Sequence, residues 1–580
     1  MKRWAGDGVA ILIVAPLVAV VLAPGWFVGH DDLHPVRLFE QDLMIRSGQF
    51  PVRWYPDIAG GYGSPHPQFY APFFYLLAQI FLFAGLPLTA SLKGAVAVVV
   101  IATSIAMYRL VRAFFGEEGG LVAAAAVSYA PYHLLDLFVR TAFSELTVFL
   151  FVPLVLLGFH RLAERPGPGR IAAAGAALAG LCLGHTITLL LVPPLLVSFL
   201  LLLAWRERFD AKVLRAAAAA AILGFALAGF FLVPLVAEQG AIDTSVFSTG
   251  YFTFDRHFVA PVQLLWSRWG YGLSAEGAAD AMSFRLGVLQ ILGCLAAALL
   301  APRIRRASAP GAAMTLYMGI LSAAGVFMAL RVSAPVWRAV GPLQFVQFPW
   351  RFLVLPAIGT AFLAGAAVSA VTRGGAGRAW VPALCTALII AASAGMLGFE
   401  KRIPIETIRF RRVSSPERRA DLSRDRVPGG LTRGFVRNQF LDWPDHLPPG
   451  AFPPPPDEGD LDRPRAEVVG GRAALTVEER GPVRYHLSVR AEEPSLVRLN
   501  VYRFPGWRWL LDGRPAPWGP APADRPALTL EVPAGLHEVE AAYVRTAPRW
   551  AGDILSLASI GVLTALAAVA MKRREDSLSS

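Results

Sequence analysis

Two adjacent carboxylates, Asp31 and Asp32, follow the first apolar run of the chain in the segment GHDDLHPVRLFEQ, which begins at Gly29. His34 stands two residues further on. A carboxylate at a membrane surface beside histidines can accept a proton from a substrate hydroxyl, which is general-base catalysis. One of these polar side chains could instead cap a helix that begins near Pro35. Because a cap needs only one carboxylate, we predict that Asp32 caps the helix and that Asp31 is the base.

Further ionisable side chains stand at the predicted outer ends of apolar runs. They are Asp57 and His66 in WYPDIAGGYGSPHP, Arg140 and Glu145 in FVRTAFSELTVF, His185 in CLGHTITLL and Arg351 in LQFVQFPWRFLVLP. Each has an ordinary explanation: turn chemistry for the first pair, a salt bridge for the second, a structural hydrogen bond for the histidine and snorkelling for the last arginine. Ionisable groups at membrane depth nevertheless mark functional sites. A fixed arginine there suits the phosphate of a lipid.

The elements that must position these residues cross a membrane. The chain has 580 residues, of which 55% are hydrophobic and 17% are charged. Apolar stretches of roughly 18–25 residues recur along it, each long enough to cross the core of a bilayer. The net charge of +12 reflects basic loops that set orientation and does not indicate nucleic-acid binding. No small-residue cleavage site follows the first run, so we predict an anchor and not a signal peptide.

Other common site types are not indicated by the sequence. The three cysteines, Cys182, Cys294 and Cys385, lie inside apolar runs. They therefore suggest no disulfide framework, zinc pair or thiol nucleophile. The sequence has neither the GxGxxG dinucleotide fingerprint nor a GxxxxGK[ST] phosphate loop, which argues against a nucleotide site.

Thirteen apolar segments are candidate spans: 9–27, 68–86, 91–111, 120–137, 146–162, 171–186, 188–204, 216–236, 285–301, 312–331, 352–371, 379–398 and 551–571. The short basic loops and both basic tails all reach the cytoplasmic side only if one early segment does not cross. The weakest segment is 68–86, which contains Pro72 and many aromatic residues. We therefore predict twelve spans, two cytoplasmic termini and a segment 68–86 that dips into the outer leaflet and returns.

This topology places outside the cell residues 28–90, 138–145, 237–284, 332–350 and 399–549. The ionisable residues named above gather at that outer end, while the spans carry almost no charge at mid-depth. A transporter working by alternating access is expected to hold polar groups near the midplane, so the pattern favours chemistry at the outer surface. The first loop is predicted to contain an amphipathic helix that starts near Pro35, ends at Ser47 and lies flat on that surface.

The predicted fold class is an all-α polytopic membrane protein with about twelve transmembrane helices and a small extracytoplasmic β-sandwich near the C-terminus. The predicted parts are a transmembrane domain 1–398 with a large first external loop 28–90, a linker 399–465, the sandwich 466–549, and a last span with its tail 550–580. Alternating segments such as RYHLSVRA and ALTLEVP indicate the strands. In FPGWRWLLDG we predict a core Trp509 and a turn at Asp512–Gly513; stacking of the tryptophans on sugar is the alternative.

Several stretches resemble, in the same order, the GT-C superfamily of membrane glycosyltransferases. The resemblance is closer to bacterial YfhO-like proteins and to membrane proteins labelled 6-pyruvoyl-tetrahydropterin synthase-related, a label that implies no pterin chemistry. The stretches are GHDDLHPVRLFEQDLMIRSGQFPVRWYPDIAGGYGSP, VRTAFSE, LGHTIT, QFPWRF and FPGWRWLLDGRPAP. Together they cover most of the chain at intervals.

The resemblance implies transfer of a sugar from a polyprenyl-phosphate carrier to an acceptor outside the bacterial cytoplasmic membrane. The acceptor would be an envelope glycan, a lipid or a protein. Nucleotide sugars are not expected there, so the activated sugar must arrive on a lipid. Asp31 or Asp32 would take the proton from the acceptor hydroxyl in an inverting displacement. Arg351, with Arg140 or His185, would neutralise the leaving phosphate.

The resemblance also suggests roles for the remaining polar residues. His34, Asp57, His66 and Glu145 would orient substrates or hold a divalent ion, and hard oxygen ligands suit Mg²⁺ or Mn²⁺. The sequence leaves the metal requirement open. Two other functions also stay open. One is a transporter or flippase for lipid-linked glycans, with a phosphate pocket but no bond cleavage. The other is a non-catalytic scaffold whose β-domain binds an envelope glycan.

Overall fold

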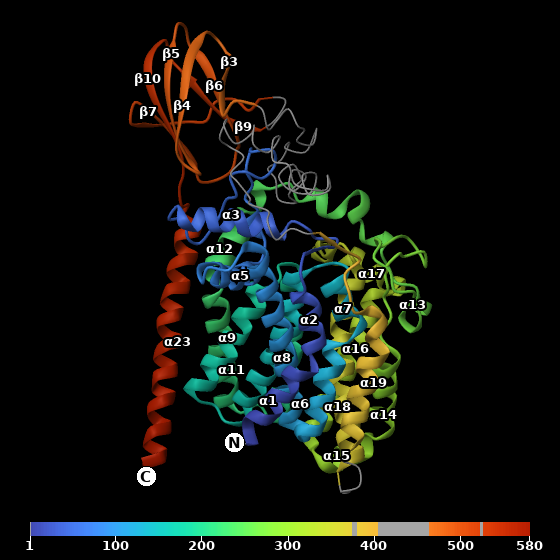
Figure 1. Ribbon diagram of the computed structural model, residues 1–580. Coiled ribbons are helices and arrows are strands. Elements are labelled where there is room, and N and C mark those ends of the chain that lie inside the picture. The colour runs from blue at the N-terminus through green and yellow to red at the C-terminus, as the bar shows by residue number, and fades with distance from the viewer. Residues whose placement is uncertain (1, 374–379, 404–462, 523–525, 580) are drawn as a thin grey trace.

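The protein is a helical bundle that carries a β-sandwich at one end (Figure 1). The structure is a computed structural model that describes residues 2–373, 380–403, 463–522 and 526–579. Most of the predicted linker 399–465 lies outside these residues. The last helix, α23 (Ala547–Ser579), leaves the sandwich and runs along the side of the bundle to the far end.

The helices of the bundle follow the predicted apolar runs. They are α1 (Lys2–Ile13), α2 (Ala15–Leu22), α6 (Leu88–Ser128), α7 (Pro131–Phe138), α8 (Phe143–Glu164), α9 (Pro168–Gly184), α10 (Val192–Arg206), α11 (Ala211–Leu227), α12 (Gly229–Glu238), α14 (Val288–Leu299), α15 (Ala301–Ala307), α16 (Ala309–Ala329), α18 (Val354–Thr372) and α19 (Trp380–Ser393). Their buried apolar side chains form one continuous core.

The number of membrane spans is bounded by helix length and composition. Five of the described helices are long and apolar enough to cross a membrane, or up to eight if each of three bent pairs is one span. Four more apolar helices are shorter, with 10–17 residues. Twelve spans therefore stays a prediction. The protein itself has the helices of an integral membrane protein.

Helix α6 contains two arms that fold back on each other. Gly116, with φ +82° and ψ −174°, interrupts its helical backbone, and only glycine adopts such a φ readily. Gly120 packs against Tyr108, because a Cβ added to Gly120 would lie 2.7 Å from Cδ2 of that ring. Residues twelve apart in one continuous helix would be about 18 Å apart. The chain thus turns at Gly116, in agreement with the two separate runs predicted at 91–111 and 120–137.

The predicted dipping segment 68–86 forms two short helices, α4 (His66–Phe69) and α5 (Phe73–Phe83). An 11-residue helix covers about 16 Å, roughly half of a bilayer core, so α5 cannot cross a membrane by itself. It lies at the sandwich end of the bundle beside α3 (His34–Arg46) (Figure 1). These features agree with a segment that enters the membrane and returns.

The C-terminal domain is a sandwich of two antiparallel sheets. One sheet has the strand order β4-β5-β10-β7-β8 and the other has β3-β6-β9. The strands are β3 (Ala466–Gly470), β4 (Ala473–Gly481), β5 (Arg484–Ala491), β6 (Ser495–Tyr502), β7 (Trp507–Leu511), β8 (Arg514–Ala516), β9 (Ala527–Val532) and β10 (Gly535–Tyr543). The alternating segments are strands, as predicted. Asp512 and Gly513 turn the β7–β8 hairpin with φ of +51° and +75°.

The sandwich packs on the first long loop of the chain, residues 28–90. Trp507 of β7 meets Trp54 edge-on, with 5.7 Å between ring centroids. Tyr502 stacks on Tyr62 at 5.0 Å, and its N–H donates to the Tyr62 carbonyl at 2.9 Å. Buried residues of the loop and of both sheets share one apolar cluster. The loop and the sandwich therefore form a single packed unit.

The sequence predicted that helix α3 lies flat on a free surface. In the structure the helix is covered on two sides. Val36 and Met44 belong to the core shared with the sandwich, whereas Leu38 belongs to the core of the bundle. Arg37 and Gln41 are buried as well. The apolar stripe was recognisable in the sequence, but the polar face is also covered because it meets α5.

Replacing Trp509 should unfold the sandwich. Trp509 is only 1% exposed in β7, and removal of a buried tryptophan commonly costs about 3–5 kcal/mol. We expect Trp509→Ala to lose folded yield and thermal stability in the full-length protein. Trp518→Ala, at a ring that is 36% exposed, should lose little. A well-folded Trp509→Ala protein with weakened acceptor binding would contradict the core assignment.

Candidate active site

The loop that carries Asp31 is held by the loop between α7 and α8. β1 (Trp26–Val28) pairs with β2 (Lys401–Ile403). Beyond it, the N–H groups of His30 and Asp31 donate to the carbonyls of Val139 and Arg140 at 3.1 and 3.0 Å. The loop between α7 and α8 thus forms one backbone unit with the loop between α2 and α3. Two loops about 110 residues apart in sequence (for example, Thr141 and Asp31) place their side chains around one point.

Asp31 lies at the centre of a polar group. Nη1 of Arg37 donates to both carboxylate oxygens at 3.0 Å. The hydroxyl of Tyr70 donates to Oδ2 at 3.3 Å, and Nε2 of His34 lies 3.7 Å from the same oxygen. The Asp31 side chain is 27% exposed. The carboxylate is therefore fixed by three neighbours and still open to a ligand.

His34 is held in one tautomer by its two hydrogen bonds. Its Nε2 lies 2.7 Å from the Thr141 carbonyl, which can only accept, so Nε2 carries the proton. Nδ1 then accepts from the Tyr75 hydroxyl at 2.8 Å. Burial lowers the pKa of His34 against the opposing effect of Asp31, which keeps the ring neutral. His34 therefore orients the loop and takes up no proton.

Electrostatics keep Asp31 ionised. Burial by itself would raise its pKa, but the Arg37 guanidinium outweighs that effect and holds the pKa of Asp31 below its usual value. Burial raises the pKa of Tyr70 to about 12, so the phenol stays a donor to the carboxylate. Asp31 is thus a carboxylate throughout the physiological pH range.

The rate of a reaction that depends on Asp31 should therefore not fall as the pH is lowered from about 8 to 5. Arg37→Gln removes the cation that opposes burial, so the pKa of Asp31 should rise. The rate of the variant should then fall as the pH is lowered into this range, and recover at higher pH. The measurement is a pH–rate profile of both proteins. Identical profiles would contradict control of Asp31 by Arg37.

The predicted cap on α3 is wrong. The helix begins at His34 and its N-cap residue is Leu33, which has no side-chain acceptor. Asp32 is half-buried beside Asp31 but does not occupy the N-cap position. The expectation failed because it fixed the helix start from the proline alone, and the helix starts one residue earlier.

A second polar group surrounds Arg140. Its guanidinium pairs with Asp136 of α7 and, at 2.8 Å, with Glu145 of α8. Tyr132 donates to the other Glu145 oxygen at 2.7 Å. The Arg140 guanidinium also lies over the Trp350 ring, 4.4 Å from its centroid. The Arg140–Glu145 salt bridge, the ordinary explanation for these two residues, is present, but it belongs to this larger group and not to an isolated turn.

Arg351 and His185 complete this second group. Nε of Arg351 lies 3.8 Å from Glu145, while its Nη1 donates to the Val346 carbonyl at 3.1 Å. Among the described residues, Nε is a buried donor without a hydrogen-bond partner. His185 bonds to Thr188 at 2.8 Å and lies within electrostatic range of Glu145, Arg351 and Asp31. His185 therefore lies near both polar groups, and its hydrogen bond goes to Thr188.

The two remaining candidates from the first loop have different surroundings. His66 stacks on Tyr70 with 4.7 Å between centroids, so it supports the phenol that reaches Asp31. Asp57 is fully buried and its N–H donates to Glu40 at 3.2 Å. Its charge also acts on Arg465, which precedes the sandwich. We therefore assign Asp57 to the junction of loop and sandwich.

The described residues do not assemble a metal site. Within the ranges that the structure describes, no three His, Cys, Asp or Glu side chains come together so that they could hold a metal ion. Asp31 is engaged by Arg37, and Glu145 by Arg140. These carboxylates face cations of the protein, so the fit to Mg²⁺ or Mn²⁺ suggested by the sequence is poor and no step is derived through a metal.

Sequence reasoning missed several partners in this site: Arg37, Tyr70, Tyr75, Tyr132, Asp136 and Trp350. Arg37 had a signal, because it stands one helical turn after His34 and so shares its face. The aromatic residues had none beyond their frequency in the segments concerned, since tyrosine and tryptophan are also common at membrane interfaces.

Comparison with known proteins gives a partial family match. Residues 66–229 match the family described as dolichyl-phosphate-mannose-protein mannosyltransferase, PMT_2. This segment includes Tyr70, Arg140, Glu145 and His185, and it begins after Asp31. The match spans less than half of the chain. No curated protein matches the chain.

Several solved structures are similar to this chain at low sequence identity. Arabinofuranosyltransferase AftD from Mycobacteria has 17% identity and a TM-score of 0.44, covering 73% of this chain and 30% of that one. ArnT from Cupriavidus metallidurans has 18% identity and a TM-score of 0.33, covering 67% of this chain and 64% of that one. The Archaeoglobus fulgidus oligosaccharyltransferase has 16% identity and a TM-score of 0.39, covering 74% of this chain and 57% of that one. The chain spans less than two thirds of each, and at such TM-scores these likenesses carry no functional conclusion.

Proposed function

We propose that the protein is a membrane glycosyltransferase that moves a sugar from a polyprenyl-phosphate carrier to an acceptor outside the cytoplasmic membrane. The observation that carries the proposal is the juxtaposition of one accessible carboxylate, Asp31, with a polar group that contains two arginines, the buried Arg140 and the half-buried Arg351. The PMT_2 match over residues 66–229, whose description names a lipid-phosphate sugar donor, supports the same class of donor.

Asp31 serves as the general base. It takes the proton from the acceptor hydroxyl as the acceptor oxygen forms a bond to the anomeric carbon. The bond between that carbon and the phosphate oxygen breaks in the same step, and its electron pair leaves with the polyprenyl phosphate. A single displacement of this kind inverts the configuration at the anomeric carbon. Arg37 and Tyr70 hold the carboxylate in place during the attack.

Arg351 supplies the cation for the leaving phosphate. Glu145 already binds Arg140 at 2.8 Å but stands 3.8 Å from Arg351. Nε of Arg351 has no hydrogen-bond partner among the described residues, so it offers a donor that an anion can take. Charge stabilisation by such fixed donors acts most strongly where the negative charge develops. Arg140, held by Asp136 and Glu145, stacks on the Trp350 ring and so fixes the group that surrounds Arg351.

The position of the site suits a lipid-linked donor. Helices α7 and α8 and the segment that begins at Pro349 bring their polar ends to the sandwich side of the bundle, above a packed apolar core. We infer that this side faces outward, with both termini in the cytoplasm, because the basic loops lie at the opposite ends of the helices. Activated sugars outside the membrane are carried by lipids.

The test is donor turnover by the purified full-length protein in lipid nanodiscs. A panel of synthetic polyprenyl-phosphate sugars is offered together with an envelope glycan fraction. The proposal expects release of polyprenyl phosphate and labelled glycan. If a fluorescent lipid-linked sugar crosses proteoliposomes intact and no donor is cleaved, the protein is a flippase and the proposal fails.

A further inference from the structure

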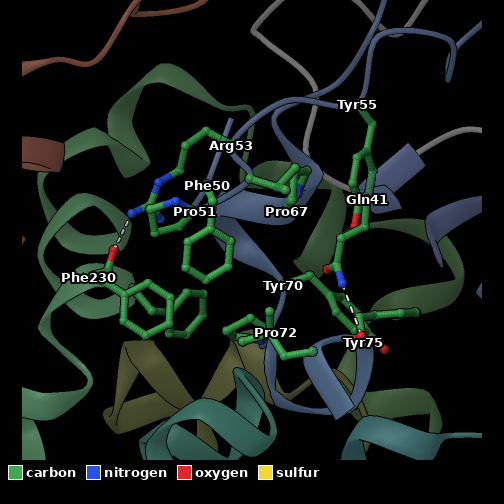
Figure 2. A pocket seen from close by; sticks show the side chains of 13 residues that line it. Gln41, Phe50, Pro51, Arg53, Tyr55, Pro67, Tyr70, Pro72, Tyr75 and Phe230 are labelled. Atoms are coloured by element: carbon green, nitrogen blue, oxygen red, sulfur yellow. Dashed lines mark hydrogen bonds between the residues drawn. The ribbon is translucent and has the colours of Figure 1, made fainter. Parts of the chain in front are cut away.

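Two cavities at opposite ends of the bundle differ in size and chemistry. The one near the sandwich (Figure 2) has about 20 Å³, enough for about one water. Its Arg53 already donates to the Phe230 carbonyl at 2.6 Å, the bond drawn in Figure 2. The other, a groove between α8, α10 and α11, has about 130 Å³. Since an apolar cavity of about 150 Å³ holds a benzene molecule, this groove can take a short length of hydrocarbon chain.

The groove has apolar walls and opens on the outside of the bundle. Every lining residue is apolar, among them Phe159 and Leu162 of α8, Leu203 of α10, and Leu214 and Ala218 of α11. The last two are exposed, so the groove is accessible from the surface of the bundle. In an integral membrane protein that surface faces the hydrocarbon chains of lipids.

The groove lies about one membrane thickness away from the candidate active site. Glu145 stands in the first turn of α8, whereas Ala163, which lines the groove, stands in its last turn. Residues eighteen apart in a helix are separated by about 27 Å, close to the thickness of a bilayer core, which is about 30 Å. The groove therefore belongs to the opposite leaflet and is separate from the site proposed for the donor phosphate.

Basic side chains surround the groove at this end of the bundle. Each of five basic residues stands within two positions of a lining residue; they are Arg161, Arg165, Arg206, Lys212 and Arg215. Arg165 and Lys212 are exposed, and neither forms an ion pair with another described residue. An anion at the edge of the groove would therefore meet cations that the protein itself does not neutralise.

The acidic residues of the same loops already have other partners. Glu207 accepts from Nε of Arg206 at 2.8 Å. The side chain of Asp210 caps the first turn of α11, and Glu164 lies 3.5 Å from Nε2 of His160. The acids therefore leave the positive charge beside the groove in excess.

We infer that this groove binds an anionic glycerophospholipid, with part of an acyl chain in the groove and the phosphate on the basic side chains around it. The apolar walls favour hydrocarbon. Each basic side chain close to an anionic membrane surface strengthens the interaction about fivefold. A zwitterionic lipid brings a cation of its own, which these side chains repel. The leaflet concerned is the cytoplasmic one in the proposed orientation.

Lipid binding is measured by native mass spectrometry of the full-length protein released from detergent micelles. The probes are dioleoyl phosphatidylglycerol and dioleoyl phosphatidylcholine, which differ in headgroup charge but not in their chains. The wild type should retain phosphatidylglycerol at least about fivefold better. The double variant Arg165→Gln, Lys212→Gln should lose most of that preference. Arg303→Gln, at an exposed position of α15 outside the lining, should keep it.

A second pair of variants tests the groove itself. Ala218→Phe fills the groove from its exposed edge and should lower retention of phosphatidylglycerol about tenfold, as when about two methylenes lose their contacts. Ala219→Phe changes the next exposed position of α11, which is outside the lining, and should bind like the wild type.

Three results would overturn the inference. Equal retention of both phospholipids by the wild type would exclude recognition of an anionic headgroup. Equal retention of phosphatidylglycerol by the wild type and Ala218→Phe would exclude this location. Displacement of phosphatidylglycerol by an equal concentration of polyprenyl phosphate would make the groove a site for the sugar carrier and not for a phospholipid.

Discussion

Asp31→Asn is expected to lower sugar transfer by about 10²–10⁴-fold, the usual loss when a general base is removed. The amide keeps an oxygen that can accept from Arg37 and Tyr70, so the loop should retain its shape. It cannot accept the proton of the acceptor hydroxyl. The measurement is turnover of a synthetic polyprenyl-phosphate sugar in nanodiscs, with thermal unfolding recorded on the same samples.

Two matched variants separate a base from a structural ion pair. Arg37→Gln breaks the same pair but keeps the carboxylate, so at high pH it should retain far more activity than Asp31→Asn. Asp32→Asn changes the neighbouring carboxylate and should remain close to wild type. If Asp31→Asn and Arg37→Gln were equally inactive at every pH, or if Asp31→Asn stayed active, Asp31 would not be the base.

Arg351→Ala is expected to lower transfer by about 10²–10³-fold, as when one preorganised donor is removed from a developing anion. The loss should appear in the chemical step, because the phosphate gains charge as the bond to the sugar breaks. Arg351→Lys keeps the charge but not the geometry of the guanidinium, and should recover part of the rate. Single-turnover kinetics with saturating donor measure this effect.

The matched control is Arg338, an exposed arginine of α17 (Ala334–Ala339) that pairs with Asp255 on the same side of the bundle. Arg338→Ala should leave single-turnover rates unchanged, because surface ion pairs contribute little. If Arg351→Ala weakened only the folded state and left the rate per folded molecule intact, Arg351 would be a structural residue, and the phosphate would need another cation.

Local patterns predicted much of the fold. The strands β5 and β9 follow directly from period-two alternation in RYHLSVRA and ALTLEVP, and the bundle helices follow from apolar runs. The core position of Trp509 and the Asp512–Gly513 turn also follow from local sequence. Local patterns are informative here because each of these features depends on residues a few positions apart.

The contacts that make the site depend on residues far apart in sequence, and these could not be predicted. Arg53 pairs with Asp553, 500 positions away, and no pattern within either segment indicates the other. Charges at the outer ends of spans identified Arg140, Glu145 and Arg351 as candidates, but not their shared group. Asp57 shows how far local patterns can predict a site. Its position at the end of an apolar run suggested a site residue, whereas its contacts lie at the junction of loop and sandwich.

The most direct test is the stereochemistry of transfer. The purified protein receives a polyprenyl-phosphate sugar of one defined anomeric configuration together with the glycan acceptor, and NMR coupling constants report the configuration of the new glycosidic bond. The account predicts transfer with complete inversion, lost in Asp31→Asn. Transfer with retention, or undiminished transfer by the Asp31→Asn protein, would contradict a single displacement driven by this carboxylate.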